Sequence, residues 1–343
     1  MPFELNLSSK SVLSKEHAIL LDKIAYEIRE DYVQFISKLL LGSDDELRFM
    51  LTPLISRNTL DCTLFEDLCR LELLKRIHID STLDSVRVNN PFFHSVIANI
   101  LSKDVKVYTG KKMLYRVIEI AAKNMKILSF LAYNYTMRYI SSWFLTSTVN
   151  ALDKVPITII DTLIYPSSFD KNNFVDRHFP NLMRYNREDE NKSIYHMAYY
   201  YQVYDFVWLF RKIRHSGRTF LMPESYLKVS DYLAAFLSFT KLFRKFDGLV
   251  FRNCDVSALV TDAYYANLVN IGSSEGLLRY KLSHRLKEKG IRIKRVVHWY
   301  ENQPINKGMI LGLRTFYPEA YTVGHMGYFN SSNVVGTYPS KCD

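Results

Sequence analysis

A strand–helix–strand pattern near the end of the chain constrains its fold more than any other feature. Residues 296–328 read VVHWYENQPINKGMILGLRTFYPEAYTVGHMGY, with two short apolar runs around a stretch of helical periodicity. Pro304 lies where that helix would begin, and Pro318 lies just beyond its expected end. Because strands that alternate with helices form parallel sheets covered by helices, the segment predicts an α/β fold.

Earlier segments repeat the pattern. SVRVNNPFFHSVIANILSKDVKVY predicts a strand, a helix that begins at Pro91 and a second strand. VPITII is an unbroken apolar run of the kind found in strands buried on both faces. We therefore predict a mainly helical amino-terminal portion over residues 1–80 and a Rossmann-like parallel sheet flanked by helices over residues 81–343. A helical insertion is expected at residues 111–150.

Composition narrows the class of protein. Of the 343 residues, 48% are hydrophobic and 23% are charged, which is typical of a folded globular chain. The net charge of +10 favours anionic partners such as nucleotide phosphates or anionic lipid, whereas no docking motif for nucleic acid accompanies it. The four cysteines form no CxxC pair, and the first residues lack an apolar signal-peptide core. A cytoplasmic location is therefore expected.

One apolar stretch, residues 125–152, raises the question of a membrane span. Asn134 and Arg138 interrupt it, and a charge near the centre of a bilayer costs a few kcal/mol. We predict one or two buried helices there. Peripheral contact with the inner face of the membrane through an aromatic surface is the alternative.

Glu301 and His325 are the principal candidates for catalysis. Glu301 follows one predicted strand, and His325 ends the next, so the two strand ends would lie about 5 Å apart if the strands are neighbours. A carboxylate can take a proton from a hydroxyl group, and an imidazole can complete a proton relay. Glu301 could instead cap the helix that begins near Pro304.

Five other polar residues are candidates for ligand binding, and each also has a structural explanation. Asp161 and Glu224 follow predicted strands, where acids commonly cap helices or turns. Asn302 and Gln303 could hold a sugar or fix a backbone turn. Arg57 could hold a phosphate through both guanidinium nitrogens, or pair with an acid on a helix.

Several chemistries lack their usual motifs. The sequence contains no GxxxxGK[ST] phosphate loop, no GxGxxG fingerprint, no HExxH and no GxSxG. ATP hydrolysis, Rossmann-type redox chemistry and serine hydrolysis are therefore not expected.

The segment WYENQPINKGMILGLRTFYPEAYTVGHMGY resembles the ENQ-containing segment of bacterial surface-carbohydrate biosynthesis proteins, such as those of O-antigen and capsule. LTPLISRNTLDCTLFEDLCRLELLKRI is similar to the Ser-Arg-Asn segment near their start, and TYPSK is similar to a tract near the end of this region. The resemblance implies a glycosyltransferase of the GT-B type, in which two Rossmann-like domains face each other and the second holds most of a nucleotide-sugar donor.

The resemblance places Arg57, Asn58, Glu301, Asn302 and His325 at the cleft and makes Glu301 the candidate base. It implies the acceptor half of an enzyme that transfers a sugar from a nucleotide sugar to a glycan or a lipid-linked acceptor, with the second GT-B domain absent. No metal or other cofactor is required. A non-catalytic module that binds glycan or scaffolds other proteins, and a nucleotide-sugar epimerase, remain alternatives.

Overall fold

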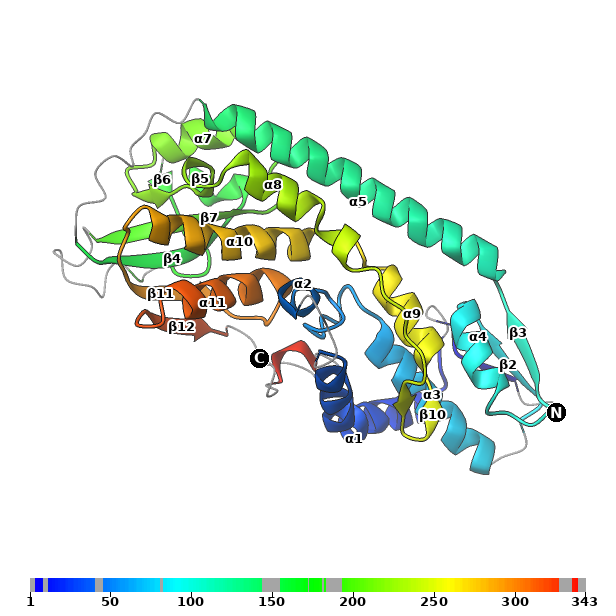
Figure 1. The fold of residues 1–343 in the computed structure, drawn as a ribbon. Coiled ribbons are helices and arrows are strands. Elements are labelled where there is room, and N and C mark those ends of the chain that lie inside the picture. Colours follow the sequence, from blue (N-terminus) through cyan, green and yellow to red (C-terminus); the bar gives the residue numbers. More distant parts are fainter. Residues whose placement is uncertain are drawn as a thin grey trace. The chain divides into compact units, whose positions relative to one another are not determined.

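The computed structural model describes residues 4–8, 12–40, 46–80, 83–143, 155–171, 173–180, 182, 193–326 and 335–338. The chain divides into two compact units (Figure 1). The first unit consists of Met1–Ile127, Phe239–Asn270 and Asn330–Asp343, and the second consists of Leu128–Ser238 and Ile271–Phe329. The predicted division after residue 80 therefore differs from the observed one, because the first unit continues beyond it and receives two later segments.

The first unit contains a three-stranded parallel sheet in the order β1-β2-β3. Its strands are β1 (Glu4–Asn6), β2 (Ser85–Val88) and β3 (Lys106–Thr109). Its helices are α1 (Lys15–Leu40), α2 (Glu46–Met50), α3 (Leu64–Asp80), α4 (Pro91–Ala98) and α9 (Ser257–Tyr265). Its short elements are β9 (Val250–Phe251), β10 (Cys254–Asp255), η4 (Ser238–Lys241) and η5 (Val335–Thr337). The first residue of η4 is the last residue of the second unit. The predicted strand–helix–strand at β2-α4-β3 is confirmed. Asn90 caps α4 by accepting from Phe92 N–H at 2.9 Å.

The second unit contains a five-stranded, wholly parallel sheet in the order β12-β11-β4-β7-β8. Its strands are β4 (Ile157–Ile164), β7 (Ile194–Tyr200), β8 (Phe220–Leu221), β11 (Ile293–Trp299) and β12 (Tyr321–His325). Its helices are α7 (Phe206–Arg214), α8 (Val229–Phe236), α10 (Ile271–Glu288) and α11 (Pro304–Phe316). The shorter elements are η1 (Pro166–Ser168), β5 (Phe169–Asp170), β6 (Asn173–Phe174) and η3 (Pro223–Ser225). The α/β class with a parallel sheet is confirmed.

Both faces of the five-stranded sheet are covered, as the apolar strands predict. Successive side chains of a strand point to opposite faces. Ile164 of β4 packs in a buried cluster with Phe206 and Phe210 of α7, whereas Asp161 of the same strand contacts Arg279 of α10. Helices α10 and α11 lie side by side on the second face (Figure 1).

The contact between α10 and α11 depends on two glycines. A Cβ atom added to Gly308 of α11 would lie 1.9 Å from the carbonyl oxygen of Gly276 on α10, which no side chain rotation can relieve. We therefore expect Gly308→Ala to lower the free energy of unfolding by about 1–3 kcal/mol, the usual cost of overpacking a core. Urea denaturation measures this change. Gly290→Ala is the comparison, because Gly290 has open space around its Cβ position and only its φ of +72° opposes substitution. Equal stability of Gly308→Ala and the native protein would contradict the close contact.

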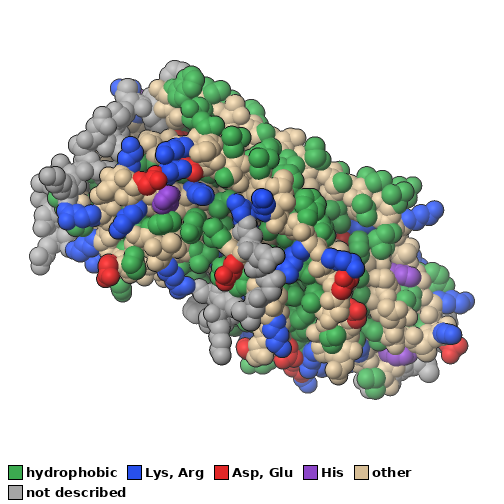
Figure 2. All heavy atoms as spheres, viewed as in Figure 1, with side chains coloured by type: hydrophobic (Ala, Val, Ile, Leu, Met, Phe, Trp, Pro, Cys, Tyr) green, Lys and Arg blue, Asp and Glu red, His purple; other side chains and the backbone are tan. Residues whose placement is uncertain are grey.

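Buried helices were predicted for residues 125–152, of which residues 144–152 lie outside the described residues. Residues 125–142 belong to helix α5 (Met113–Ser142), which is far more exposed than expected. Only four of its residues are buried: Leu131, Tyr135, Arg138 and Ser141. Hydrophobic side chains gather along it on the face shown in Figure 2. Within the described residues, no helix combines the length and the hydropathy needed to cross a membrane.

Candidate functional site

The strand order of the second unit creates a topological switch point between β4 and β11. From β4 the chain proceeds outward on one side to β7 and β8, then returns to the other side of β4 to form β11 and β12. Ligands of open α/β sheets bind outside the carboxyl ends of the strands at such a reversal. Tyr165 follows β4 and Glu301 follows β11, so both lie at this position.

Both oxygens of the Glu301 carboxylate are held by neighbouring side chains. Oε1 accepts from Trp299 Nε1 at 2.6 Å, and Oε2 accepts from Gln303 Nε2 at 2.8 Å. Gln303 rather than Glu301 occupies the N-cap position of α11. Glu301 is half-buried, so it is fixed in direction and still reaches solvent. The structure thus favours an oriented carboxylate over the helix-cap alternative.

Asn302 provides the turn that makes this arrangement possible. Its backbone has a φ of +54°, in the left-handed region that asparagine tolerates better than most residues, and it is buried. The turn redirects the chain from β11 into α11, and Asn306 Nδ2 donates to Trp299 O at 2.9 Å across it. Asn302 therefore shapes the loop from within.

Aromatic rings and imidazoles surround Trp299. The His178 ring lies 4.4 Å from the Trp299 ring and the His325 ring lies 5.4 Å from it, measured between centroids. Phe179 contacts His325 at 5.8 Å. His325 pairs with Trp299 across β12 and β11 and is exposed. The structure therefore brings Glu301 and His325 to neighbouring strand ends, with Trp299 in contact with both.

The turn that carries His178 and Phe179 is anchored by Asp176. Its Oδ1 accepts from the backbone N–H groups of His178 and Phe179, each at 2.9 Å, and its Oδ2 accepts from Thr162 Oγ1 of β4 at 2.8 Å. Thr162 also lies 3.1 Å from His196 Nδ1. Burial lowers the pKa of His196 to about 4, although the charge of Asp176 opposes this shift. His196, inside β7, is therefore neutral at physiological pH.

Tyr165 and Arg177 complete this side of the edge. The Arg177 guanidinium lies 5.4 Å from the Tyr165 ring centroid and donates to Ser167 Oγ at 2.7 Å. Burial is the main cause that raises the pKa of Tyr165. Tyr201 and Glu301 raise this pKa further by smaller amounts, and the charge of Arg177 lowers it. The charge of Glu301 thus acts on Tyr165 from across the switch point, and Arg177 is an exposed cation beside Tyr165.

Asp161 and Glu224 are both buried, and each forms an ion pair with a buried arginine. Asp161 lies inside β4, which continues to Ile164, and its Oδ1 accepts from Arg279 Nη1 at 2.5 Å. Glu224 follows β8 in a short turn, where it is buried and accepts from Arg138 Nε at 2.9 Å and from Tyr200 Oη at 2.8 Å. The prediction that a strand ends at Asp161 is wrong, because the apolar run after it also belongs to the strand.

Arg57 and Asn58 belong to the first unit, whereas β4 and β11 belong to the second. Arg57 is 1% exposed, has a φ of +54° and donates from Nη2 to Tyr338 O at 2.9 Å. Asn58 accepts from Leu60 N–H at 3.1 Å and donates to Asp61 Oδ2 at 3.1 Å. Both side chains stabilise a local fold in the first unit.

Sequence reasoning missed four contributors to the edge: Tyr165, Arg177, His178 and Trp299. Trp299 was the most accessible to prediction, because it lies two residues before Glu301 on a predicted strand. The other three lie in a segment that carries no periodic pattern, so only the fold places them.

Among the residues that the structure describes, no group of three or more His, Cys, Asp or Glu side chains is arranged to hold a metal ion. A scan against protein-family models found no match, and comparisons with curated proteins and with solved structures found none either. The candidate site therefore depends on its own geometry.

Proposed function

We propose that this chain takes part in surface polysaccharide biosynthesis by transferring a sugar from a nucleotide sugar to a glycan or a lipid-linked acceptor. The observation that carries the proposal is the Glu301 carboxylate, fixed by Trp299 and Gln303 at the switch point of a parallel sheet. The chain would supply the acceptor side of a GT-B-like enzyme. The five-stranded, wholly parallel sheet of the second unit is compatible with a Rossmann-like domain of such an enzyme, which supports the proposal.

The edge has the groups that a saccharide needs. Aromatic side chains present an apolar face to the C–H surface of a sugar ring. The Trp299 ring lies 4.4 Å from the His178 ring and 5.4 Å from the His325 ring between centroids, so three rings are available at this edge. The carboxylate of Glu301 and the amide of Gln303 provide an acceptor and a donor for hydroxyl groups. An acceptor sugar held here would have one hydroxyl beside Glu301.

The transfer reaction follows from this placement. Glu301 takes the proton from the acceptor hydroxyl as its oxygen forms a bond with the anomeric carbon of the donor. The bond between that carbon and the phosphate oxygen breaks, and the nucleotide leaves with the electron pair. Arg177 supplies a cation beside the edge that can stabilise the departing phosphate. His325 can relay the proton away from Glu301.

A thermal-shift titration of Trp299→Leu tests ligand binding at this edge. UDP-, GDP- and CMP-linked sugars and neutral oligosaccharides are the probes. A ligand at about 100 times its dissociation constant stabilises the fold by about 2.7 kcal/mol, and Trp299→Leu is expected to remove most of that shift. Trp143→Leu is the matched control, since Trp143 is 72% exposed and lies at the end of α5. An equal shift in both variants would place the ligand elsewhere.

Helix α5 supports peripheral contact with an anionic membrane, where a lipid-linked acceptor would reside. Its exposed apolar residues include Leu114, Ile118 and Met125, and Lys126 is an exposed cation on the same helix. Apolar burial and attraction to anionic lipid together determine such binding. The double substitution of Ile118 and Met125 by glutamate is expected to abolish cosedimentation with phosphatidylglycerol vesicles. Retention of cosedimentation would exclude this face, and vesicles of neutral lipid give the background.

A further inference from the structure

The first unit contains a cavity of about 380 Å³ that the proposed transfer reaction does not use. It lies beyond the carboxyl ends of the three parallel strands, because Leu7 and Ser8 follow β1, Asn89 and Asn90 follow β2, and Lys111 follows β3 closely. Cavities of roughly 300–1,000 Å³ accommodate small ligands, and the carboxyl edge of a parallel sheet is their usual location.

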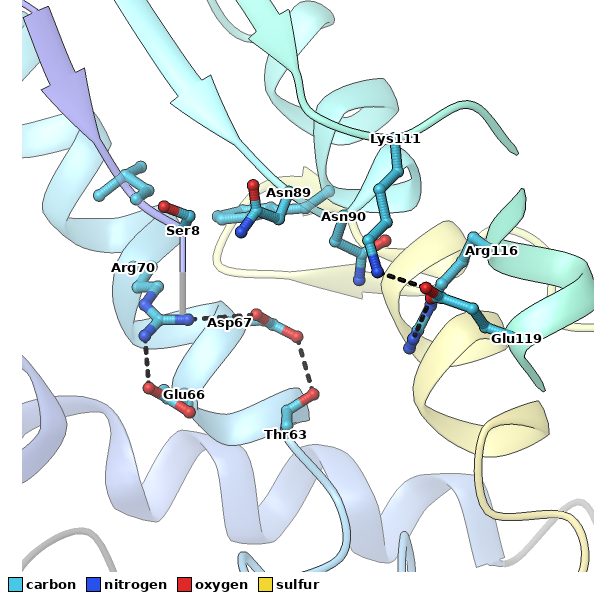
Figure 3. Close-up of a pocket in the computed structure, with 12 residues that line it drawn as sticks. Ser8, Thr63, Glu66, Asp67, Arg70, Asn89, Asn90, Lys111, Arg116 and Glu119 are labelled. Atoms are coloured by element: carbon cyan, nitrogen blue, oxygen red, sulfur yellow. Dashed lines mark hydrogen bonds and ion pairs between the residues drawn. The ribbon is translucent and has the colours of Figure 1, made fainter. Parts of the chain in front are cut away.

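Polar side chains from four segments line this cavity, and Figure 3 shows them converging on it. One segment follows β1, a second consists of Thr63 and the first turns of α3, a third follows β2, and a fourth consists of the connection after β3 and the first turns of α5. The polar lining residues are Ser8, Thr63, Glu66, Asp67, Arg70, Asn89, Asn90, Lys111, Arg116 and Glu119. Such convergence from separate segments indicates a built site rather than a gap in packing.

The charges in the lining balance one another. Arg70 pairs with Glu66 at 2.5 Å, Lys111 pairs with Glu119, and Arg116 Nε pairs with Asp262 at 2.8 Å. Each cation therefore already has a carboxylate partner. A phosphate or other anion would have to compete with those carboxylates, so the cavity favours an uncharged ligand.

The other polar groups in the lining can form hydrogen bonds with the hydroxyl groups of a ligand. The Asn89 amide is exposed and makes no hydrogen bond within the described part of the chain, so its donor and acceptor are both available. Leu7 and Phe93 add a small apolar surface to the lining. Alternating donors and acceptors beside an apolar patch match a ring that carries hydroxyls on its rim and C–H groups on its face.

Asp67 is the hydrogen-bond acceptor in the lining whose protonation changes near neutral pH. It is 8% exposed, accepts from Thr63 Oγ1 at 3.1 Å, and lies 3.9 Å from Arg70 Nη1. Burial raises the pKa of Asp67 to about 7, while Arg70 and Thr63 lower it and the nearby charges of Asp262 and Glu66 raise it slightly. Its carboxyl group therefore exchanges between a donor and a charged acceptor near neutral pH.

We propose that this cavity binds an uncharged sugar ring, with Asn89 and Asp67 as hydrogen-bonding partners of its hydroxyls. The proposal is independent of the transfer reaction, because every lining residue belongs to the first unit and Glu301 belongs to the second. A sugar bound here is held in addition to any ligand at the β4–β11 edge.

Saturation-transfer NMR with glucose, galactose, mannose and N-acetylglucosamine tests the proposal on the full chain. At least one of these sugars is expected to bind at concentrations up to about 50 mM, and Asn89→Ala is expected to weaken that binding by about tenfold. Asn89 is exposed, so this variant should keep its fold. Asp104→Asn is the control for Asp67→Asn, because Asp104 is an exposed acid of the same unit that does not line the cavity.

The pH profile separates the role of Asp67 from a general effect. The ionised carboxylate is the stronger acceptor, so affinity is expected to rise severalfold from about pH 6 to about pH 8 in the native chain and in Asp104→Asn. Asp67→Asn is expected to show no such rise.

Three outcomes with the native chain and the Asn89→Ala variant would overturn the proposal. These are no binding of any of the four sugars, binding that Asn89→Ala leaves unchanged, and displacement of the sugar by inorganic phosphate at equal concentration. Glu301→Gln should retain the binding in full, so loss of transfer with retained sugar binding separates this site from the proposed function. Loss of sugar binding in Glu301→Gln would place the sugar at the β4–β11 edge and would also reject the cavity.

Discussion

Replacing Arg138 with methionine is expected to lower the free energy of unfolding by about 3–5 kcal/mol, because removal of one partner strands buried charge. Arg138 donates from Nε to Glu224 at 2.9 Å and from Nη1 to Glu275 at 2.6 Å. Its side chain is 4% exposed, and those of Glu224 and Glu275 are 1% and 9% exposed. Without Arg138, two carboxylates would face each other in a dry interior.

Thermal unfolding followed by circular dichroism measures the effect, and a loss of this size corresponds to about 10 °C in the melting temperature. Arg214→Met, an exposed arginine on α7, is the matched control and should change little. Adding Glu224→Gln and Glu275→Gln to Arg138→Met is expected to restore part of the stability, because the stranded charges are then gone. A single variant within about 1 kcal/mol of the native protein would show that the network is not buried in solution.

Glu301→Gln is expected to reduce sugar transfer by about 100-fold or more while leaving the fold intact, since general base catalysis contributes about 10²–10⁴-fold. Glutamine keeps the size of the side chain and can still accept from Trp299 Nε1. It cannot take a proton from an acceptor hydroxyl. The change should therefore appear in the turnover number rather than in the affinity for either substrate.

Transfer from UDP-, GDP- or CMP-linked sugars to a saccharide that stabilises the native chain is the assay, with product detected by mass spectrometry. Glu319→Gln is the control, because Glu319 is exposed in the connection between α11 and β12, one helix away from Glu301. Equal turnover in Glu301→Gln and Glu319→Gln would remove Glu301 as the base. A modified sugar nucleotide formed without any acceptor would indicate epimerisation instead of transfer.

The sequence was most informative where a local pattern determines a local structure. Strand β11, helix α11 and strand β12 were predicted because apolar periodicity and the position of Pro304 act over a few residues. The placement of Glu301 and His325 at adjacent strand ends followed from that. Gly290 closes α10 with a φ of +72°, as expected for a glycine after a helix.

Long-range contacts could not be predicted in the same way. Asp161 pairs with Arg279, which is 118 residues away in the sequence, and the residues around either one do not predict this partner. The division into two units could not be predicted from local patterns either. Strand β1 contains only three residues, and the first unit includes the distant segment Phe239–Asn270. A pattern-based boundary at residue 80 follows helix content, whereas the true boundary follows three-dimensional packing.

The anchoring of the His178 turn by a single carboxylate has a consequence for how such a protein can diversify. Asp176 holds the turn through backbone N–H groups, so it imposes no requirement on which side chains stand at positions 178 and 179. The rings that meet Trp299 and His325 can therefore be exchanged while the strand that carries Glu301 stays as it is. Under the proposed function, substitutions in this turn alone could change which saccharide binds while Glu301 keeps its position.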